Sequence, residues 1–298
     1  MKKKNSKFIR HLIIIILVFG YYYIKDINKE SYSKQENPII EEVDTSLSIH
    51  YIDVGQADSI LIKNNQYNML IDAGNNEDGP LLVKYLKEEQ NIEKLDFVVG
   101  THPHEDHIGG LDDIINNIEV KEVYLPEAMT TTKTFEDVLD AIANNNLEIT
   151  IPEIGEKFTI GDLKFEVIYT GNGDKGLNES SIILKMNFGK HNYLFTGDTT
   201  SEIEKIILTK DINIDVLKVA HHGSKYSSSE AFLATSTPDY AIISVGDQNS
   251  YNHPDKEAIN RLLKHTKNIY ITKDVGTIIL TSDGKNIKIN TIKTNTNG

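Results

Sequence analysis

A cluster of potential metal ligands occupies one short stretch of this 298-residue sequence. Three histidines and an aspartate fall within six residues, in His102-Pro103-His104-Glu105-Asp106-His107, although the whole chain has only ten histidines. Neutral imidazoles and carboxylates bind divalent Zn or Mn, and four of them so close together can converge on one site. The run therefore predicts a metal centre; the alternative is a solvated loop that is rich in histidine by chance.

The segments on either side of this run show how it is positioned. Residues 95–100 form an apolar run typical of a buried strand, and the spacing of Ile114, Ile115 and Ile118 indicates a helix. The ligands are therefore expected on a loop between a strand and a helix, where the active sites of layered α/β folds tend to lie.

The same alternation of strands and helices continues from residue 47 onward. Asp198 follows the apolar run 193–195, and His221 and His222 close the run 216–220. Hairpins interleaved with helices suit two sheets covered by helices on their outer faces. We expect helices at 81–89, 111–117, 135–145, 201–209, 230–235 and 254–265, and strands at 47–54, 58–63, 67–72, 95–100, 122–125, 157–170, 181–188, 192–196, 214–220, 239–245, 268–272 and 276–292.

Taken in order, these motifs resemble the metallo-β-lactamase superfamily, and within it the ComEC/Rec2-like branch of hydrolase domains, over roughly residues 48–292. The resemblance implies a four-layer αββα sandwich with metal ligands in loops at one edge. It rests on the histidine run together with the stretches Tyr51 to Ser59, Leu70 to Gly74, Phe195 to Thr199, Lys218 to Ser224 and Asn252 to Pro254.

The resemblance also implies two divalent ions, Zn or Mn. It assigns His102 and His104 to the first ion, Asp106 and His107 to the second, and places Asp198 between both. From its position alone, Asp198 could instead cap the helix expected from about residue 200.

One departure from the wider superfamily concerns the first ion. The superfamily supplies a further histidine before the bridging aspartate, whereas the ComEC/Rec2-like branch has Asn-x-Ser, which Asn178-Glu179-Ser180 matches. The only histidine in that interval, His191, lies in an expected hairpin turn that points to solvent. The first site is then incomplete, or it is completed by water or Asn178.

The pair His221-His222 ends a predicted strand, where adjacent side chains point in opposite directions. We expect His221 to bind the second ion and His222 to carry a proton or contact a phosphate; the reverse order and a purely structural pair are the alternatives. Asp106 is the expected residue for orienting or deprotonating the attacking water. Ser224 and Lys225 would lie near developing negative charge on a substrate.

Further residues are expected to support the ligands or to contact substrate. Asp53, Gln56 and Asp58 form a cluster at the end of the first expected strand, and the resemblance places this stretch beside the metals. Asp72 is expected to fix a ligand histidine through its other ring nitrogen, although turn chemistry is the alternative for each of these residues. His253, in Asn-His-Pro, is a ligand, a substrate contact or part of a turn before a helix.

The start of the chain predicts a membrane anchor. Residues 1–25 carry six positive and no negative charges, and Leu12 to Ile24 is an apolar run of 13 residues. Such a pattern is typical of a signal anchor, although the run is shorter than the roughly 20 residues that span a bilayer comfortably. We expect an anchor at 1–25, a polar linker at 26–46 and a catalytic domain at 47–298. The anchor would cross the cell membrane once and leave the catalytic domain outside the cytoplasm. Secretion after signal cleavage is the alternative.

Composition limits the chemistry and the partners. The chain carries a net charge of −13, so residues 26–298 carry −19, which opposes a broad nucleic-acid-binding surface. Zero cysteines exclude disulfides and thiolate ligands, and the sequence contains neither a Gly-x-Ser-x-Gly nucleophile elbow nor a phosphate-binding Gly-x-x-x-x-Gly-Lys loop. These features favour hydrolysis by a metal-activated water.

The resemblance implies a phosphodiester substrate, either single-stranded DNA or a cell-wall phosphoester. The alternatives are a lactone or thioester hydrolase and a non-catalytic metal-binding module. No protein partner is inferred.

Overall fold

The computed structural model describes residues 47–247, 249–266 and 268–293. The expected anchor at 1–25 and linker at 26–46 lie outside the described residues, so both stay predictions. Among the helices that are described, none has the length and apolar character needed to cross a membrane.

Within the described residues, the first sheet has eight strands in the order β15-β14-β1-β2-β3-β4-β5-β6. Neighbouring strands from β15 to β3 are antiparallel, and those from β3 to β6 are parallel. The strands are β1 (Leu47–Tyr51), β2 (Ser59–Asn64), β3 (Tyr67–Ala73), β4 (Lys94–Val99), β5 (Glu119–Tyr124), β6 (Ile149–Thr150), β14 (Thr277–Ser282) and β15 (Ile287–Ile292).

The second sheet has seven strands in the part of the chain that is described, in the order β13-β12-β11-β10-β9-β8-β7. It is antiparallel from β7 to β10 and parallel from β10 to β13. The strands are β7 (Lys157–Ile160), β8 (Leu163–Tyr169), β9 (Ile183–Phe188), β10 (His191–Phe195), β11 (Val216–Lys218), β12 (Tyr240–Ile243) and β13 (Asn268–Ile271).

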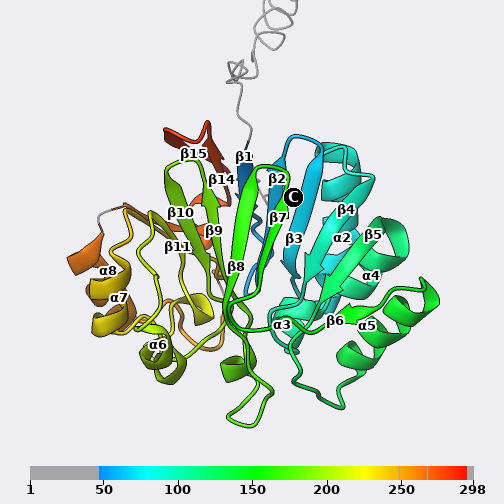
Figure 1. Ribbon diagram of the computed structural model, residues 1–298, viewed down its shortest axis with the longest axis horizontal. Helices are drawn as coiled ribbons and strands as arrows, with labels where there is room; N and C mark the ends of the chain where they lie inside the picture. The colour runs from blue at the N-terminus through cyan, green and yellow to red at the C-terminus, as the bar shows by residue number, and fades with distance from the viewer. Residues whose placement is uncertain (1–46, 248, 267, 294–298) are drawn as a thin grey trace, which may run out of the picture. The chain divides into compact units, whose positions relative to one another are not determined.

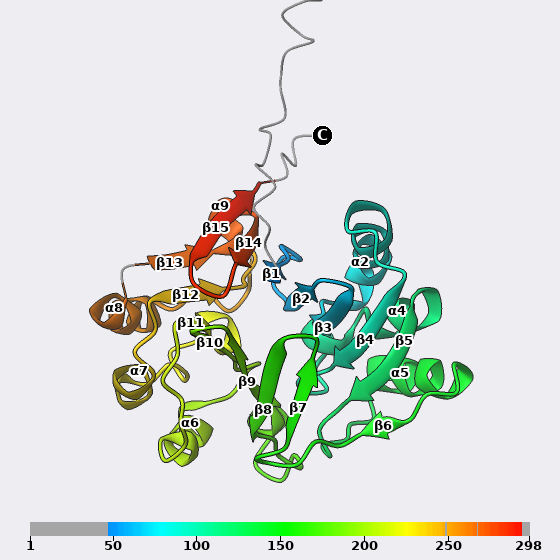
Figure 2. The same cartoon turned by 45° about the horizontal axis from the view of Figure 1, so that its top comes forward.

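Helices cover the outer face of each sheet, as Figures 1 and 2 show. Helices α2, α4 and α5 lie on the first sheet, and α6, α7 and α8 lie on the second. The helical segments are η1 (Asn76–Asp78), α2 (Gly79–Lys84), η2 (Tyr85–Glu89), α3 (Glu105–Ile108), α4 (Leu111–Asn117), α5 (Lys133–Asn144), η3 (Asn178–Ser180), α6 (Ser201–Ile207), η4 (His221–Gly223), α7 (Glu230–Ser236), α8 (Lys256–His265) and α9 (Thr272–Val275).

Three apolar cores hold these layers together. The largest lies between the sheets and contains Tyr51, Phe165 and Tyr193, all essentially inaccessible to solvent. The other two cores lie between each sheet and its helices. Because burial of apolar area is the main favourable term in folding, this arrangement accounts for the stacking of four layers. The expected αββα sandwich is confirmed.

Some element boundaries differ from the sequence expectation. Residues 157–170 and 276–292, each expected as one β segment, are the hairpins β7-β8 and β14-β15. The period-2 pattern continues through a tight turn, and the turn at Gly161, with a φ of +58°, interrupts the first of them. Residues 105–108, expected as loop, form the short helix α3.

Candidate metal centre

The first group of candidate ligands lies at the carboxyl end of β4. His102 and His104 occupy the loop after Val99, and Asp106 and His107 lie on α3. Gly109 ends this helix and donates its N–H to Gly74 O over 2.9 Å. A side chain at Gly109 would put its Cβ 2.2 Å from the backbone of Asn75, so glycine is required for α3 to pack against the end of β3.

The second group lies at the carboxyl ends of β10 and β11 in the other sheet. Asp198 follows β10, and its N–H donates to Ser181 Oγ at 3.1 Å. His221 and His222 follow β11 in the turn η4, with φ angles of +53° and +51°. Two consecutive non-glycine residues in the left-handed region are unusual and are held there only by strong surrounding packing. The turn sends His222 inward, where its Nδ1–H donates to Ser244 O at 2.9 Å.

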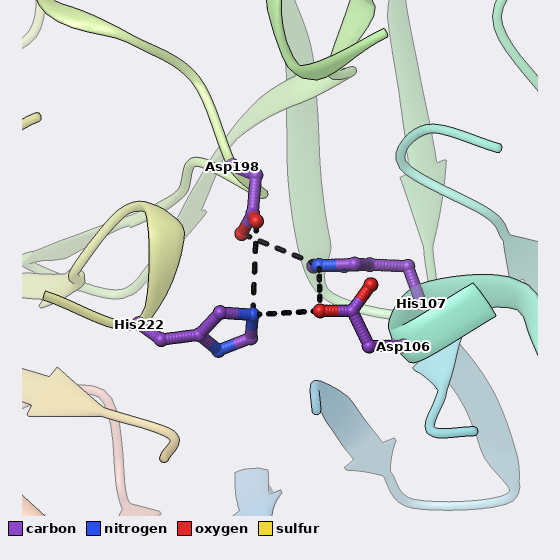
Figure 3. Close-up of side chains that lie close together, drawn as sticks. All are labelled: Asp106, His107, Asp198 and His222. Carbon is purple, nitrogen blue, oxygen red and sulfur yellow. Dashed lines mark hydrogen bonds and ion pairs between the residues drawn. The ribbon is translucent and has the colours of Figure 1, made fainter. Parts of the chain in front are cut away.

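These two groups meet in a four-residue cluster of Asp106, His107, Asp198 and His222, whose side chains point toward one another in Figure 3. His107 Nε2 lies 3.3 Å from Asp198 Oδ1 and 3.9 Å from Asp106 Oδ2. His222 Nε2 lies 3.2 Å from Asp106 Oδ2 and 3.6 Å from Asp198 Oδ2. The cluster therefore joins loops from both sheets.

The donor atoms of the four-residue cluster fit a divalent cation. His107 Nε2 and Asp198 Oδ1 are buried, and neither has a hydrogen-bond partner within the described residues. Two ligands that each lie about 2.1 Å from a tetrahedral ion are about 3.4 Å apart, which is close to the separations seen here. A bound ion would contact both of these buried atoms, which face each other at 3.3 Å without a hydrogen bond.

A buried carboxylate, that of Asp72, holds the His107 ring through the nitrogen that faces away from the cluster. Asp72 Oδ2 accepts from His107 Nδ1 at 2.8 Å, and Asp72 also accepts from the N–H and the hydroxyl of Thr101 at 2.7 and 2.8 Å. These contacts keep the proton on Nδ1 and leave Nε2 free to face the cluster. Asp72 thus lies where it supports a ligand histidine.

The candidate ligands of a first ion lie beside the cluster. His102 Nε2 is 3.0 Å from His104 Nδ1, and the rings of His102 and His107 are 4.1 Å apart. Asn178 Oδ1 is buried without a hydrogen-bond partner in the described part of the chain, and Asn178 lines the same pocket as His104. Asn178 can therefore complete this group.

His191 does not belong to the centre. It begins β10, whereas Asp198 follows the end of that strand. Its ring is only 13% exposed and its Nδ1 lies 3.4 Å from Asp215 Oδ1, so the expectation that it points into solvent is wrong. Asp215 directly precedes β11, so this pair lies at the amino ends of two parallel strands, opposite the ends that Asp198 and His221 follow.

The cluster holds strongly shifted acid–base groups. Burial lowers the pKa of His107, but the carboxylates of Asp198, Asp72 and Asp106 outweigh burial and raise that pKa well above its usual range. Burial raises the pKa of Asp198, and the imidazolium groups of His107 and His222 outweigh it and lower that pKa well below its usual range. A cation must displace the histidine protons, so metal affinity rises with pH.

A pocket of about 330 Å³ opens above the cluster. His221 lies in its wall, with its Nε2 3.8 Å from Asp198 Oδ2. The structure thus places His222, and not His221, inside the cluster, the reverse of the order favoured by the sequence. Side chains alternate only within a strand, and both histidines lie in a left-handed turn beyond β11. The pocket is lined by Gln56, His104, Glu105, Asp106, Asn178, Asp198, His221, His222, Tyr251 and His253.

Asp53, Ser224 and Lys225 are expected substrate-contacting residues that do not line this pocket. Asp53 lines a separate groove with Leu81 and Thr277, and its N–H donates to Thr277 Oγ1 at 3.0 Å. Ser224 is buried, and its Oγ accepts from Tyr226 N at 3.3 Å. Lys225 is exposed, with its Nζ 5.3 Å from the centre of the Tyr226 ring.

Lys218 is a residue of the centre that the sequence analysis did not single out. Its Nζ lies 2.6 Å from Asp58 Oδ2, and both side chains are only 1% exposed. Asp58 Oδ1 in turn lies 3.6 Å from Nδ1 of His222. The sequence does contain a signal that could have identified Lys218, because it is a lysine in the apolar strand Val216-Leu217-Lys218 and a buried charge needs a partner.

The sequence of the chain matches known proteins over most of the described region. The profile of the Metallo-beta-lactamase superfamily matches residues 52–247. The chain is 31% identical to ComE operon protein 3 of Bacillus subtilis, over 77% of this chain and 32% of that protein. It is 28% identical to Recombination protein 2 of Haemophilus influenzae, over 85% of this chain and 29% of that protein. The chain thus spans about a third of the length of these ComEC-like competence proteins.

Solved structures with low sequence identity share the fold. The metallo-beta-lactamase fold protein YhfI from Bacillus subtilis superposes with a TM-score of 0.51 at 14% identity, covering 78% of this chain and 98% of YhfI. CmlA, a diiron beta-hydroxylase from Streptomyces venezuelae, superposes with a TM-score of 0.54 at 13% identity, covering 80% of this chain and 54% of CmlA. The sequence match and the four-layer sandwich agree, and the chain belongs to the metallo-beta-lactamase superfamily.

Proposed function

We propose that this protein is a metal-dependent phosphodiesterase that uses an activated water. The observation that carries the proposal is the four-residue cluster on the floor of an open pocket, in which the buried atoms His107 Nε2 and Asp198 Oδ1 face each other at 3.3 Å and make no hydrogen bond within the described residues. Similarity to ComEC-like competence proteins supports a phosphodiester as the substrate. Zn or Mn suits the imidazole and carboxylate donors.

The residues around the pocket have different proposed roles in hydrolysis. When bound, the ions would supply an activated water and would neutralise negative charge on the oxygens of the phosphate under attack. Asp106, whose side chain is 29% exposed, can orient that water or accept its proton. His221 faces the pocket and can give a proton to the leaving oxygen, a role that suits it better than His222, whose two ring nitrogens face Ser244 O and Asp106.

The substrate we favour is single-stranded nucleic acid, and a cell-wall phosphoester is the other phosphodiester candidate. A charge of −19 on residues 26–298 repels polyanions at long range. Binding is therefore expected to be local to the pocket and strongly dependent on the bound ions.

Parallel assays on the purified full chain test this function. We expect Mn or Zn to support hydrolysis of bis-p-nitrophenyl phosphate and of a labelled single-stranded oligonucleotide, and a chelator to abolish both until the ion is added back. A lactone or thioester that is hydrolysed faster than either diester would point to a carbonyl hydrolase instead. Stoichiometric metal binding without turnover of any of these substrates would indicate a non-catalytic module.

We further propose that residues 1–25 hold the domain at the outer face of the cell membrane. The six positive charges and the apolar run Leu12 to Ile24 support this location. Protease added to intact cells should then degrade the domain while it stays with the membrane fraction, whereas protection of the domain from protease would place it inside the cell.

A further inference from the structure

A series of contacting aromatic rings extends from the candidate metal centre to the mouth of the pocket. The rings of His221 and His253 meet edge to face, with their centres 5.8 Å apart. The ring of Tyr251 stacks on His253 at 5.7 Å, with 17° between the ring planes. Tyr251 and His253 both line the pocket, so this stack forms part of its wall.

The outer ring of this series is open to solvent, and hydrogen bonds from Asn249 hold the backbone of His253, on which that ring stacks. Tyr251 is 66% exposed, which leaves the ring face away from His253 accessible. Asn249 Nδ2 donates to Gly246 O and to His253 O, each at 2.9 Å, and Asn249 Oδ1 accepts from His253 N at 2.8 Å. An exposed tyrosine that is held in place offers a flat apolar surface at little cost in conformational entropy.

A neighbouring loop adds a second exposed ring and a cation. Tyr226 is 65% exposed, and Lys225 Nζ lies 5.3 Å from the centre of its ring. The carboxylate of Asp255 joins the two loops, since its Oδ2 accepts from Lys225 N at 2.8 Å and lies 3.4 Å from His253 Nδ1. We name Lys225, Tyr226, Tyr251 and His253 the aromatic rim.

We propose that the aromatic rim binds an unpaired nucleobase and so holds the adjacent phosphodiester over the metal centre. The inference rests on the phosphodiesterase function proposed above and adds the part of the substrate that is recognised. Exposed aromatic rings beside a cation are the combination with which proteins bind single strands, because every base has a π face that can stack. A base that must stack on Tyr251 is unpaired, so the rim selects against duplex substrate.

A phosphorylcholine ester is one form that a cell-wall phosphoester could take, and the rim is less suited to its choline headgroup. A quaternary ammonium is held by several aromatic faces that surround it, whereas Tyr251 presents one open face. Lys225 on the same rim would repel that cation, and it would attract the phosphates that flank a nucleobase.

Two oligonucleotides of equal length test the rim, one of thymidines and one of abasic tetrahydrofuran units, each with the same terminal fluorophore. For the metal-loaded full chain, Tyr251→Ala should raise the KM for the thymidine strand roughly tenfold. The kcat for that strand and both constants for the abasic strand should stay within twofold, and Tyr251→Phe should behave as the unaltered protein. Leu81→Ala, at a side chain that is 68% exposed in the other groove, is the matched control and should change neither substrate.

The outcomes separate the rim from the proposed function. If Tyr251→Ala affects both strands equally, or affects neither, the rim does not bind bases. A KM for p-nitrophenyl phosphorylcholine that rises in Tyr251→Ala while the KM for the thymidine strand does not would assign the rim to choline instead. If the unaltered protein cleaves neither strand nor bis-p-nitrophenyl phosphate, the phosphodiesterase proposal fails, and dissociation constants of the same two strands from fluorescence anisotropy decide the rim separately.

Discussion

Asp198→Ala is expected to remove both the bound metal and the hydrolytic activity. Asp198 faces three imidazoles, with Oδ1 3.3 Å from His107 Nε2 and Oδ2 3.6 and 3.8 Å from Nε2 of His222 and His221. Because metal ions supply several kcal/mol of transition-state stabilisation, we expect kcat/KM for a diester to fall about 10³-fold or more. Elemental analysis of the purified variant should find at least one ion fewer per chain than in the unaltered protein.

Two further variants sharpen this result. Asp198→Asn keeps the shape of the side chain and removes its charge, so it should lose metal almost as fully as alanine does. Asp140→Ala, on the exposed face of α5, should keep both metal and activity. An Asp198→Ala protein with full metal content and unchanged turnover would refute the placement of the metal centre.

Lys218→Met is expected to be the most destabilising single substitution in the wall of the centre. It leaves the Asp58 carboxylate, 1% exposed, without the ammonium that now lies 2.6 Å away. Removing one partner of a buried ion pair costs roughly 3–5 kcal/mol, since the remaining charge is uncompensated. For a domain of this size we expect the midpoint of thermal unfolding to fall by about 10 °C, measured by calorimetry with a chelator present so that metal binding does not contribute.

A double substitution distinguishes the effect of the unpaired Asp58 charge on stability from the effect of changed packing at Lys218. Lys218→Met with Asp58→Asn removes both charges, and much of the lost free energy of unfolding should return because no unpaired ion remains. Lys264→Met, at a surface lysine whose side chain is 62% exposed and pairs with Glu230, should change stability by less than about 1 kcal/mol. Strictly additive effects of the two buried substitutions would show that Lys218 and Asp58 do not depend on each other.

Most of the helices and strands could be predicted from the sequence, because the periodicity of hydrophobic residues reflects which side chains are buried. The helix expected at 111–117 coincides with α4, and the strand expected at 67–72 differs from β3 by one residue. Tight turns are harder to predict, since alternation continues through them, as the β7-β8 hairpin shows. The density of donors in the run from His102 to His107 is what made a cluster of candidate metal ligands predictable.

Side-chain direction beyond the strand ends was not predictable from sequence. The left-handed turn that exchanges His221 and His222 depends on Gly223, whose φ is +79° and where a Cβ would lie 2.6 Å from Pro254. That contact joins residues some 30 positions apart, so no local pattern reveals it. The ion pair of Lys218 with Asp58 spans 160 positions, and only the packing of one sheet on the other brings the two side chains together.

The division of the four-residue cluster between two sheets also bears on how the protein is made. Asp106 and His107 leave the ribosome well before Asp198 and His222, which belong to the other sheet. A nascent chain that has been synthesised only as far as β9 holds half of the donors and cannot retain an ion through all four. Binding of the proposed ion through all four side chains would therefore require both sheets to be synthesised and packed against each other.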